Sequence, residues 1–208
     1  MKVLLINGSP RGEGCTYTAL QEAACTLEEC GIETEIVSVG NKPVRGCIGC
    51  GTCSRKGNGR CVFNDDAVNE ILAKAEEADG YIFGSPVHFA SASGAITSLM
   101  DRMFYAGKCF AHKPAAAIVS CRRGGATASF DQLNKYFTIR NMPVVSSNYW
   151  NMVHGNTPDE VRQDEEGMQT VRILARNMAW LLKCIEAGKA AGIEVPAIEP
   201  KISTNYIR

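Results

Sequence analysis

The feature that most constrains the fold is a short apolar run followed at once by a glycine-rich loop near the start of the chain. Val3–Ile6 is continuously apolar, which is typical of a parallel strand buried on both faces. The loop Asn7–Thr16 follows, and a helical pattern begins after it. Because a helix start offers unpaired backbone N–H groups and a partial positive charge, this arrangement predicts an anion site.

The loop also carries side chains suited to a phosphate. Its candidate ligands are Ser9, Arg11, Gly14, Cys15 and Thr16. We expect Gly8, Gly12 and Gly14 to adopt positive φ and to let a ligand approach the backbone. The loop has neither the Gly-x-Gly-x-x-Gly spacing of a dinucleotide site nor the Lys-Ser/Thr pair of a triphosphate site, which favours a single phosphate. The alternative is an ordinary turn in which Thr16 caps the helix.

Strand and helix patterns alternate along the rest of the chain. Apolar runs predict strands at residues 2–6, 33–39, 81–83, 115–119 and 142–145. Helical spacing lies between them and again over 158–189, so we predict a doubly wound, five-stranded parallel sheet in a three-layer α/β/α architecture. Because the sequence has no internal repeat and no low-complexity linker, we expect residues 1–208 to form a single domain. It has a cysteine-rich insert at about 40–62 and an extended tail at about 190–208.

Composition does not favour nucleic acid or a membrane as partner. The chain has 208 residues, and Lys+Arg and Asp+Glu each total 22, so its formal net charge is zero. A neutral chain gives no reason to expect nucleic acid or an anionic membrane as partner. No apolar stretch reaches the ~20 residues of a membrane helix, and the N-terminus has no signal-peptide pattern. We expect a cytoplasmic protein.

Two further loops should meet the first one at the same edge of the sheet, because ligands bind beyond the carboxyl ends of parallel strands. The loop after the third strand contributes Pro86, Val87, His88, Phe89, Ala90 and Ser91, and the loop after the fourth contributes Cys121, Arg122, Arg123, Gly124 and Gly125. One phosphate, flat apolar groups and backbone amides together suit flavin mononucleotide, FMN. Either arginine could stabilise an anionic reduced flavin, the alternative being a solvated surface pair. A histidine in the position of His88 more often packs against its neighbours than acts as an acid or base.

Several motifs together resemble the NAD(P)H-dependent FMN reductase group of flavodoxin-like proteins, and within it the iron–sulfur flavoproteins. They are the Gly-Ser-Pro-Arg loop, Gly84–Phe89, Asp101–Arg102, Arg123–Gly125, Tyr149–Asn151 and the ending Thr204–Arg208. The resemblance implies a flavodoxin-like fold with FMN at the switch point of the sheet, a homo-oligomer with the flavin near subunit interfaces, and electron transfer. Tyr149 is expected near the flavin or at a subunit contact, with core packing as the alternative. His88 and Cys15 depart from the usual Tyr and Ser/Asn of this group, and Cys15 is not expected to be a nucleophile.

The cysteine run is the sharpest chemical signal. Its members are Cys47, Cys50, Cys53 and Cys61. Three cysteines at steps of three can point inward from a loop that nearby glycines allow to wind tightly, and four thiolates suit a [4Fe–4S] cluster. The resemblance extends to these residues. The alternatives are a zinc site and a metal-free thiol cluster. The surrounding cations could offset cluster charge or be solvated: Lys42, Arg45, Arg55, Lys56 and Arg60.

These observations favour an FMN-dependent oxidoreductase, to which no catalytic side chain is assigned. Electrons would pass between NAD(P)H or a reduced, ferredoxin-like protein donor and an unidentified acceptor, through the cysteine cluster if it is metallated. The sequence offers no separate nicotinamide site, so NAD(P)H would stack transiently on the flavin. A homodimer or homotetramer is expected. The alternatives are a non-enzymatic flavodoxin-like electron carrier and a redox-sensing flavoprotein.

Overall fold

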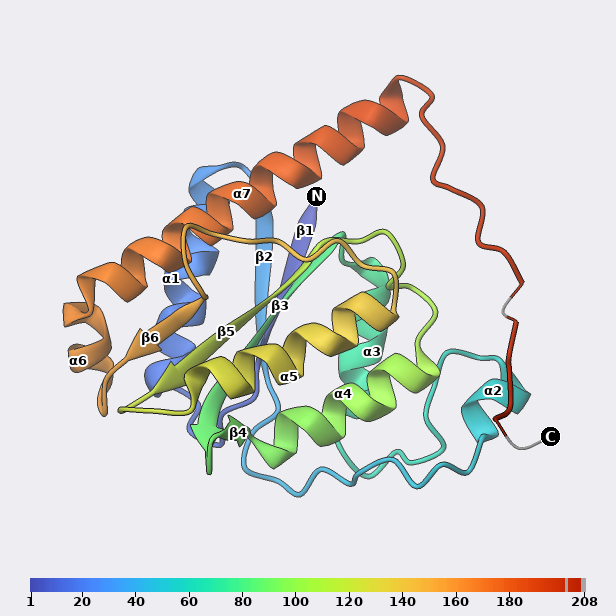
Figure 1. Ribbon diagram of the computed structural model, residues 1–208, viewed down its shortest axis with the longest axis horizontal. Helices are drawn as coiled ribbons and strands as arrows, with labels where there is room; N and C mark the ends of the chain where they lie inside the picture. Colours follow the sequence, from blue (N-terminus) through green and yellow to red (C-terminus); the bar gives the residue numbers. More distant parts are fainter. Residues whose placement is uncertain (201, 207–208) are drawn as a thin grey trace.

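The sheet at the centre of the protein is parallel and five strands wide. The structure, a computed structural model, describes residues 1–200 and 202–206. The strands run in the order β2 (Glu33–Ser38), β1 (Lys2–Asn7), β3 (Gly80–His88), β5 (Ala115–Cys121) and β6 (Met152–His154), as Figure 1 shows. A short sixth strand, β4 (Ser91–Ala92), pairs antiparallel with the end of β3. This is a doubly wound order, with its switch point between β1 and β3.

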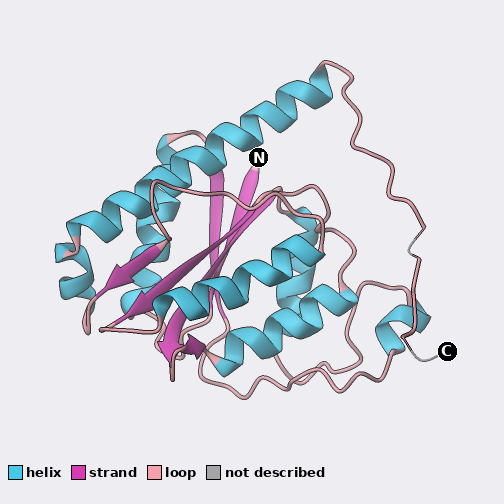
Figure 2. Cartoon of the chain, in the orientation of Figure 1, coloured by secondary structure: helices cyan, strands magenta, loops and turns pink. Residues whose placement is uncertain are grey.

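Helices cover both faces of the sheet (Figure 2). One face carries α1 (Cys15–Glu29), α6 (Pro158–Gln163) and α7 (Glu165–Ala190), and the other carries α3 (Val68–Glu77), α4 (Gly94–Ala106) and α5 (Ala126–Ile139). A further short helix, α2 (Thr52–Lys56), lies within the cysteine-rich insert. The predicted three-layer α/β/α architecture is confirmed.

The alternation of side chains along β1 explains why this strand has no polar face. Leu4 and Ile6 pack into the core beneath α3, α4 and α5, whereas Val3 and Leu5 pack into the core beneath α1 and α7. All four side chains are fully buried. A strand covered on both sides must be apolar throughout, and this produces the continuous run seen in the sequence.

The prediction of a fifth strand at residues 142–145 is wrong. Only Val144 forms an isolated parallel bridge there, with Ala115. The chain then leaves the sheet and rejoins β5 as β6, where Met152 pairs with Val119. Val145 donates to the Ala115 carbonyl, but Pro143 has no N–H and can only accept a hydrogen bond. The apolar run therefore touches the sheet edge once and does not form a continuous strand.

The C-terminal segment has no helix or strand in its described part. Residues 191–200 and 202–206 are exposed. Lys201, Ile207 and Arg208, which belong to the predicted tail, lie outside the described residues. Within 1–200 and 202–206, no helix is both long and apolar enough to span a bilayer.

Candidate functional site

A cavity of about 250 Å³ opens at the carboxyl ends of β1, β3, β5 and β6. It is lined by Ser9, Pro10, Arg11, Cys15, Thr16, Pro86, Val87, His88, Ser120, Cys121, Arg122, Gly155 and Asn156. This lining contains two arginines and neither aspartate nor glutamate. Three loops that the sequence predicted to converge therefore do meet, and their charge favours an anionic ligand.

The N-terminus of α1 forms one end of this cavity. Its N-cap is Gly14, and no side chain caps the helix or places a carboxylate in its first turn. The free N–H groups of that turn and the helix dipole therefore remain available for an anion. Cys15 and Thr16, the first residues of α1, both line the cavity.

Internal hydrogen bonds hold the loop before α1 in shape. The Asn7 side chain accepts from the Ser9 amide at 3.1 Å and donates to the Gly12 carbonyl at 3.2 Å. The Ser9 hydroxyl oxygen accepts from the Arg11 amide at 3.1 Å. Because Ser9 Oγ acts here as an acceptor, its own proton remains free to be donated to a ligand.

The expectation of positive φ at Gly8, Gly12 and Gly14 is wrong, since none of them adopts it. Gly8 is needed for close packing instead. A Cβ at that position would lie 2.6 Å from Ile96 Cβ, and the Gly8 amide donates to the Gly84 carbonyl at 2.8 Å. The loop is therefore pressed against α4 and β3 and does not turn through left-handed backbone.

Two hydroxyl groups tie α1 to β5 within the cavity. Thr16 Oγ1 and Ser120 Oγ lie 2.7 Å apart, and both residues are buried. A single hydrogen serves this bond, so the other hydroxyl proton can be donated elsewhere. Burial raises the pKa values of the Cys15 and Cys121 thiols. Both therefore stay protonated at neutral pH, and neither is suited to be a nucleophile.

A tight hairpin between β3 and β4 stands at the rim of the cavity. Phe89 and Ala90 form its two-residue turn, with φ of 51° and 58°. Positive φ at both turn residues is the type I′ pattern, which usually requires Asn or Gly. Phe89 is completely exposed. An unfavourable backbone that presents a bare aromatic ring beside a ligand cavity is typical of a functional segment.

The structure brings some predicted residues to the cavity and leaves others beside it. Those outside the lining are Gly14, Phe89, Ala90, Ser91, Arg123, Gly124, Gly125 and Tyr149. Ser91 donates to the Gln132 side chain at 2.7 Å, and the site of a Gly125 Cβ would lie 2.6 Å from Ala90 Cα. The loop after β3 and the loop after β5 therefore pack against one another, and part of each faces the cavity.

Sequence reasoning missed Gly155 and Asn156, because it placed the fifth strand too early. The available signal was the short run Met152–His154 before Gly-Asn-Thr-Pro, where Thr157 caps α6. Tyr149 lies in the preceding loop and lines a separate hollow with Trp150, His154 and Asp164. The Tyr149 and Trp150 rings are in edge contact and exposed.

The four cysteines of the insert line a second cavity, of about 150 Å³. Cys47 and Cys50 are exposed, whereas Cys53 and Cys61 are partly buried. Gly49 and Gly51 adopt φ of 64° and 66°, which lets the run wind as predicted. The hydrogen bond from Thr52 lowers the pKa of the Cys50 thiol.

The donor set of this second cavity fits a thiolate-bound metal group, since four thiols and no carboxylate line it. The sulfur atoms are not gathered: among the residues that the structure describes, no three Cys, His, Asp or Glu side chains are grouped closely enough to hold a metal ion. A metal group would therefore require the exposed part of the run, Cys47–Cys50, to close around it.

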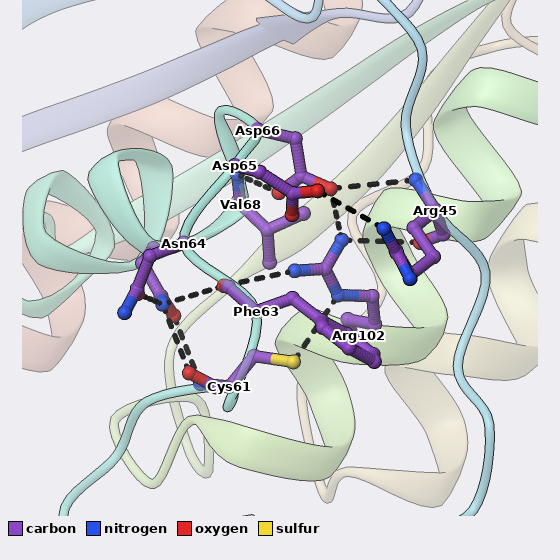
Figure 3. Close-up of polar contacts among 9 residues, drawn as sticks. Arg45, Cys61, Phe63, Asn64, Asp65, Asp66, Val68 and Arg102 are labelled. Atoms are coloured by element: carbon purple, nitrogen blue, oxygen red, sulfur yellow. Dashed lines mark hydrogen bonds and ion pairs between the residues drawn. The ribbon is translucent and has the colours of Figure 1, made fainter.

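Two of the five cations that the sequence placed around the cysteines are already paired with carboxylates. Arg45 bonds Asp65 at 3.0 Å, and Arg60 bonds Glu76 at 2.8 Å. The cation in the cavity wall is Arg102, from α4, which donates from Nε to Cys61 Sγ at 3.2 Å (Figure 3). It lies 41 residues from Cys61, so no local pattern connects the two.

Comparison with known proteins identifies the family. Residues 1–157 match the sequence model of the NADPH-dependent FMN reductases. The chain belongs to this family. The protein is therefore an FMN-dependent oxidoreductase.

Several relatives of this protein carry the name iron–sulfur flavoprotein. One from Methanocaldococcus jannaschii is 39% identical over 195 residues, which cover 89% of this chain and 100% of the relative. Another from Methanosarcina thermophila is 31% identical over 195 residues, which cover 91% of this chain and 99% of the relative. The resemblance stated from the motifs is confirmed.

Solved structures agree on the fold. RosB with a bound intermediate superposes with a TM-score of 0.68 at 18% identity, covering 100% of this chain and 94% of RosB. A flavodoxin from the domain Archaea gives a TM-score of 0.60 at 12% identity, covering 88% of this chain and 99% of that flavodoxin. These likenesses concern the fold alone, and they confirm that it is flavodoxin-like.

Proposed function

We propose that the first cavity holds FMN and that the protein passes electrons between NAD(P)H or a reduced protein donor and an acceptor that is still to be identified. The main support is that four strand ends converge on one cavity. This cavity contains two arginines, no carboxylate and the uncapped start of α1. Bound FMN would supply the redox chemistry, and the protein would bind and orient it.

Different residues would contact different parts of FMN, according to their chemistry. The first turn of α1, the Ser9 hydroxyl and Arg11 would hold the phosphate. Pro86, Val87 and His88 would border the flat ring with apolar surface and backbone groups. Arg122 would place positive charge near the ring, where it would favour an anionic reduced flavin.

We further propose that Cys47, Cys50, Cys53 and Cys61 hold a [4Fe–4S] cluster that exchanges electrons with the flavin. The support is their shared cavity, its lack of carboxylates, and the iron–sulfur flavoprotein names of the relatives. Thiolate sulfur is the ligand type that such clusters require. Iron and zinc analysis of the purified protein tests this proposal, because zinc without iron would indicate a zinc site and neither metal would indicate a metal-free thiol cluster.

For partners we propose a second copy of this chain, as a dimer or tetramer, and a small ferredoxin-like electron donor. Exposed aromatic side chains outside the core offer contact surface for an oligomer, among them Tyr149, Trp150 and Trp180. We propose neither nucleic acid nor a membrane as partner, since the net charge is zero. Light scattering at several concentrations tests the oligomer.

Anaerobic reduction tests the proposed activity. The chain, loaded with FMN, is mixed in turn with NADH, NADPH and reduced ferredoxin, and loss of the oxidised flavin absorbance is followed. We expect at least one donor to reduce the flavin and a soluble acceptor to sustain repeated turnover. A flavin that none of the donors reduces would overturn the proposal, and reduction without turnover would indicate a carrier.

A further inference from the structure

Arg102 is a buried cation in the wall of the cysteine cavity. It lies near the end of α4, its side chain is 0% exposed, and its partner Asp66 is 4% exposed. Burying a charged group costs free energy unless its N–H donors are hydrogen-bonded and an opposite charge lies nearby. The burial of Arg102 therefore calls for an explanation. None of the flavin-site roles described above involves it.

The guanidinium joins the two sides of the cysteine-rich insert (Figure 3). Its Nη1 donates to the Arg45 carbonyl at 3.1 Å and to the Asp66 carboxylate. Its Nη2 donates to the Phe63 carbonyl at 3.2 Å. The remaining donor, Nε, points to Cys61 Sγ at 3.2 Å. One side chain thus fixes the chain just before Cys47 and just after Cys61.

Cys61 is fixed through both its backbone and its sulfur. The Asn69 side chain accepts from the Cys61 amide at 2.8 Å and donates to the Cys61 carbonyl at 2.9 Å. With Arg102 on the sulfur and Asn69 on the backbone, Cys61 is held at both ends, whereas Cys47 and Cys50 are exposed. Cys61 is therefore a fixed thiol around which the exposed Cys47 and Cys50 can close.

The same contact has an electrostatic consequence. Hydrogen bonds to ligand sulfur atoms and nearby charge set the reduction potential of a thiolate-bound cluster. One-electron reduction adds one negative charge, which a buried cation stabilises more strongly than a solvated one. Asp66 balances part of that positive charge.

We infer that Arg102 is a positioning residue of the cysteine site, which holds the Cys61 sulfur in place and favours the reduced state of a cluster bound there. This inference rests on the proposed function, because it concerns the cluster that we assign to the four cysteines. It adds a residue from α4, outside the cysteine run, as the group that sets the potential.

Redox titration of the full chain tests it. The protein is reconstituted anaerobically with iron and sulfide, iron and EPR signals are measured, and the cluster potential is titrated with dithionite. We expect Arg102→Gln to lower the reduced-to-oxidised ratio at a fixed solution potential at least tenfold, which equals about 59 mV for a one-electron couple. Arg102→Lys keeps the charge and should shift the ratio less. Asp66→Asn should shift the ratio in the opposite direction.

The matched control is Arg60→Gln, which removes a cation next to Cys61 in sequence whose guanidinium bonds Glu76 and no cysteine sulfur. We expect it to leave the potential unchanged. Equal potentials in the Arg102→Gln, Arg60→Gln and unaltered proteins would overturn the inference. A purely structural role would lower stability in Arg102→Gln without moving the potential, which is the same overturning result.

Two outcomes separate this inference from the proposed function. If the unaltered protein takes up no iron, the cluster proposal fails, and the Arg102 inference fails with it. If iron binds and the potentials coincide, only the Arg102 inference fails. Should Arg102→Gln not fold, the double variant Arg102→Gln/Asp66→Asn removes both buried charges together, and its potential is compared with that of Asp66→Asn.

Discussion

Two adjacent arginines after β5 differ in where they point. Arg122 lines the proposed FMN cavity and Arg123 does not, although both side chains are exposed. We predict that Arg122→Gln weakens FMN binding about tenfold, or about 1.4 kcal/mol, because it would remove the positive charge that we propose lies beside the bound anionic cofactor. Quenching of flavin fluorescence measures the affinity. Arg123→Gln is the matched control and should bind FMN normally, so equal losses in both variants would contradict this assignment.

The buried pair of Asp66 and Arg102 gives the metal-free protein a defined acid sensitivity. Burial alone would raise the pKa of Asp66, but hydrogen bonds from Arg102 and from the Val68 and Arg45 amides outweigh it and lower that pKa from 3.8. A carboxyl whose pKa is lower in the folded state stabilises the fold above its unfolded pKa, and this contribution is lost as the pH falls through the folded value.

We therefore predict that stability falls below pH 3.8 and that Asp66→Asn makes this fall less steep. At neutral pH the same substitution should cost about 3 kcal/mol, because it leaves the Arg102 charge uncompensated. Urea unfolding at several pH values measures both effects. Parallel pH profiles for the two proteins would contradict the prediction.

At the scale of the elements, the β3–β4 hairpin stores strain in its turn. Ala90 has φ of 58°, a conformation that glycine adopts at little cost. We predict that Ala90→Gly stabilises the protein by about 1 kcal/mol. The control is Ala128→Gly on the exposed side of α5, which should lose about 1 kcal/mol because glycine disfavours helices. Chemical unfolding measures both, and a loss in both variants would show that the turn is unstrained.

The junction between β6 and α6 is held by close packing at Gly155. A Cβ there would lie 2.7 Å from the Val161 amide nitrogen, whereas a Cβ at Gly124 would meet nothing within 4 Å. We predict that Gly155→Ala costs about 2 kcal/mol through overpacking and also weakens FMN binding, because Gly155 lines the cavity. Gly124→Ala is the control for stability. Equal unfolding midpoints would contradict the prediction.

How far the sequence could predict these elements depended on whether their signals were local. The runs that form β1, β3 and β5 are apolar because helices cover both faces of the sheet, so these three strands and the loops after them were predictable. β6 has three residues and is defined by its pairing with β5. Arg102 reaches Cys61 across 41 residues, so only the folded chain brings the two together.

At the scale of the whole molecule, α4 connects the two candidate sites. Near its start, Ser93 donates to the Gly8 carbonyl of the loop before α1 at 2.8 Å, and near its end Arg102 donates to Cys61 in the cysteine cavity. The helix has 13 residues and is therefore roughly 20 Å long.

The proposed FMN site is formed by four loops, and its phosphate end is the start of α1. A parallel titration of the unaltered chain and Arg11→Gln with FMN and riboflavin, which differ only in the phosphate, tests this site. We predict that the unaltered chain binds FMN at least tenfold more tightly than riboflavin, about 1.4 kcal/mol, and that Arg11→Gln reduces this preference. Equal binding of FMN and riboflavin by the unaltered chain would contradict this assignment of the phosphate site.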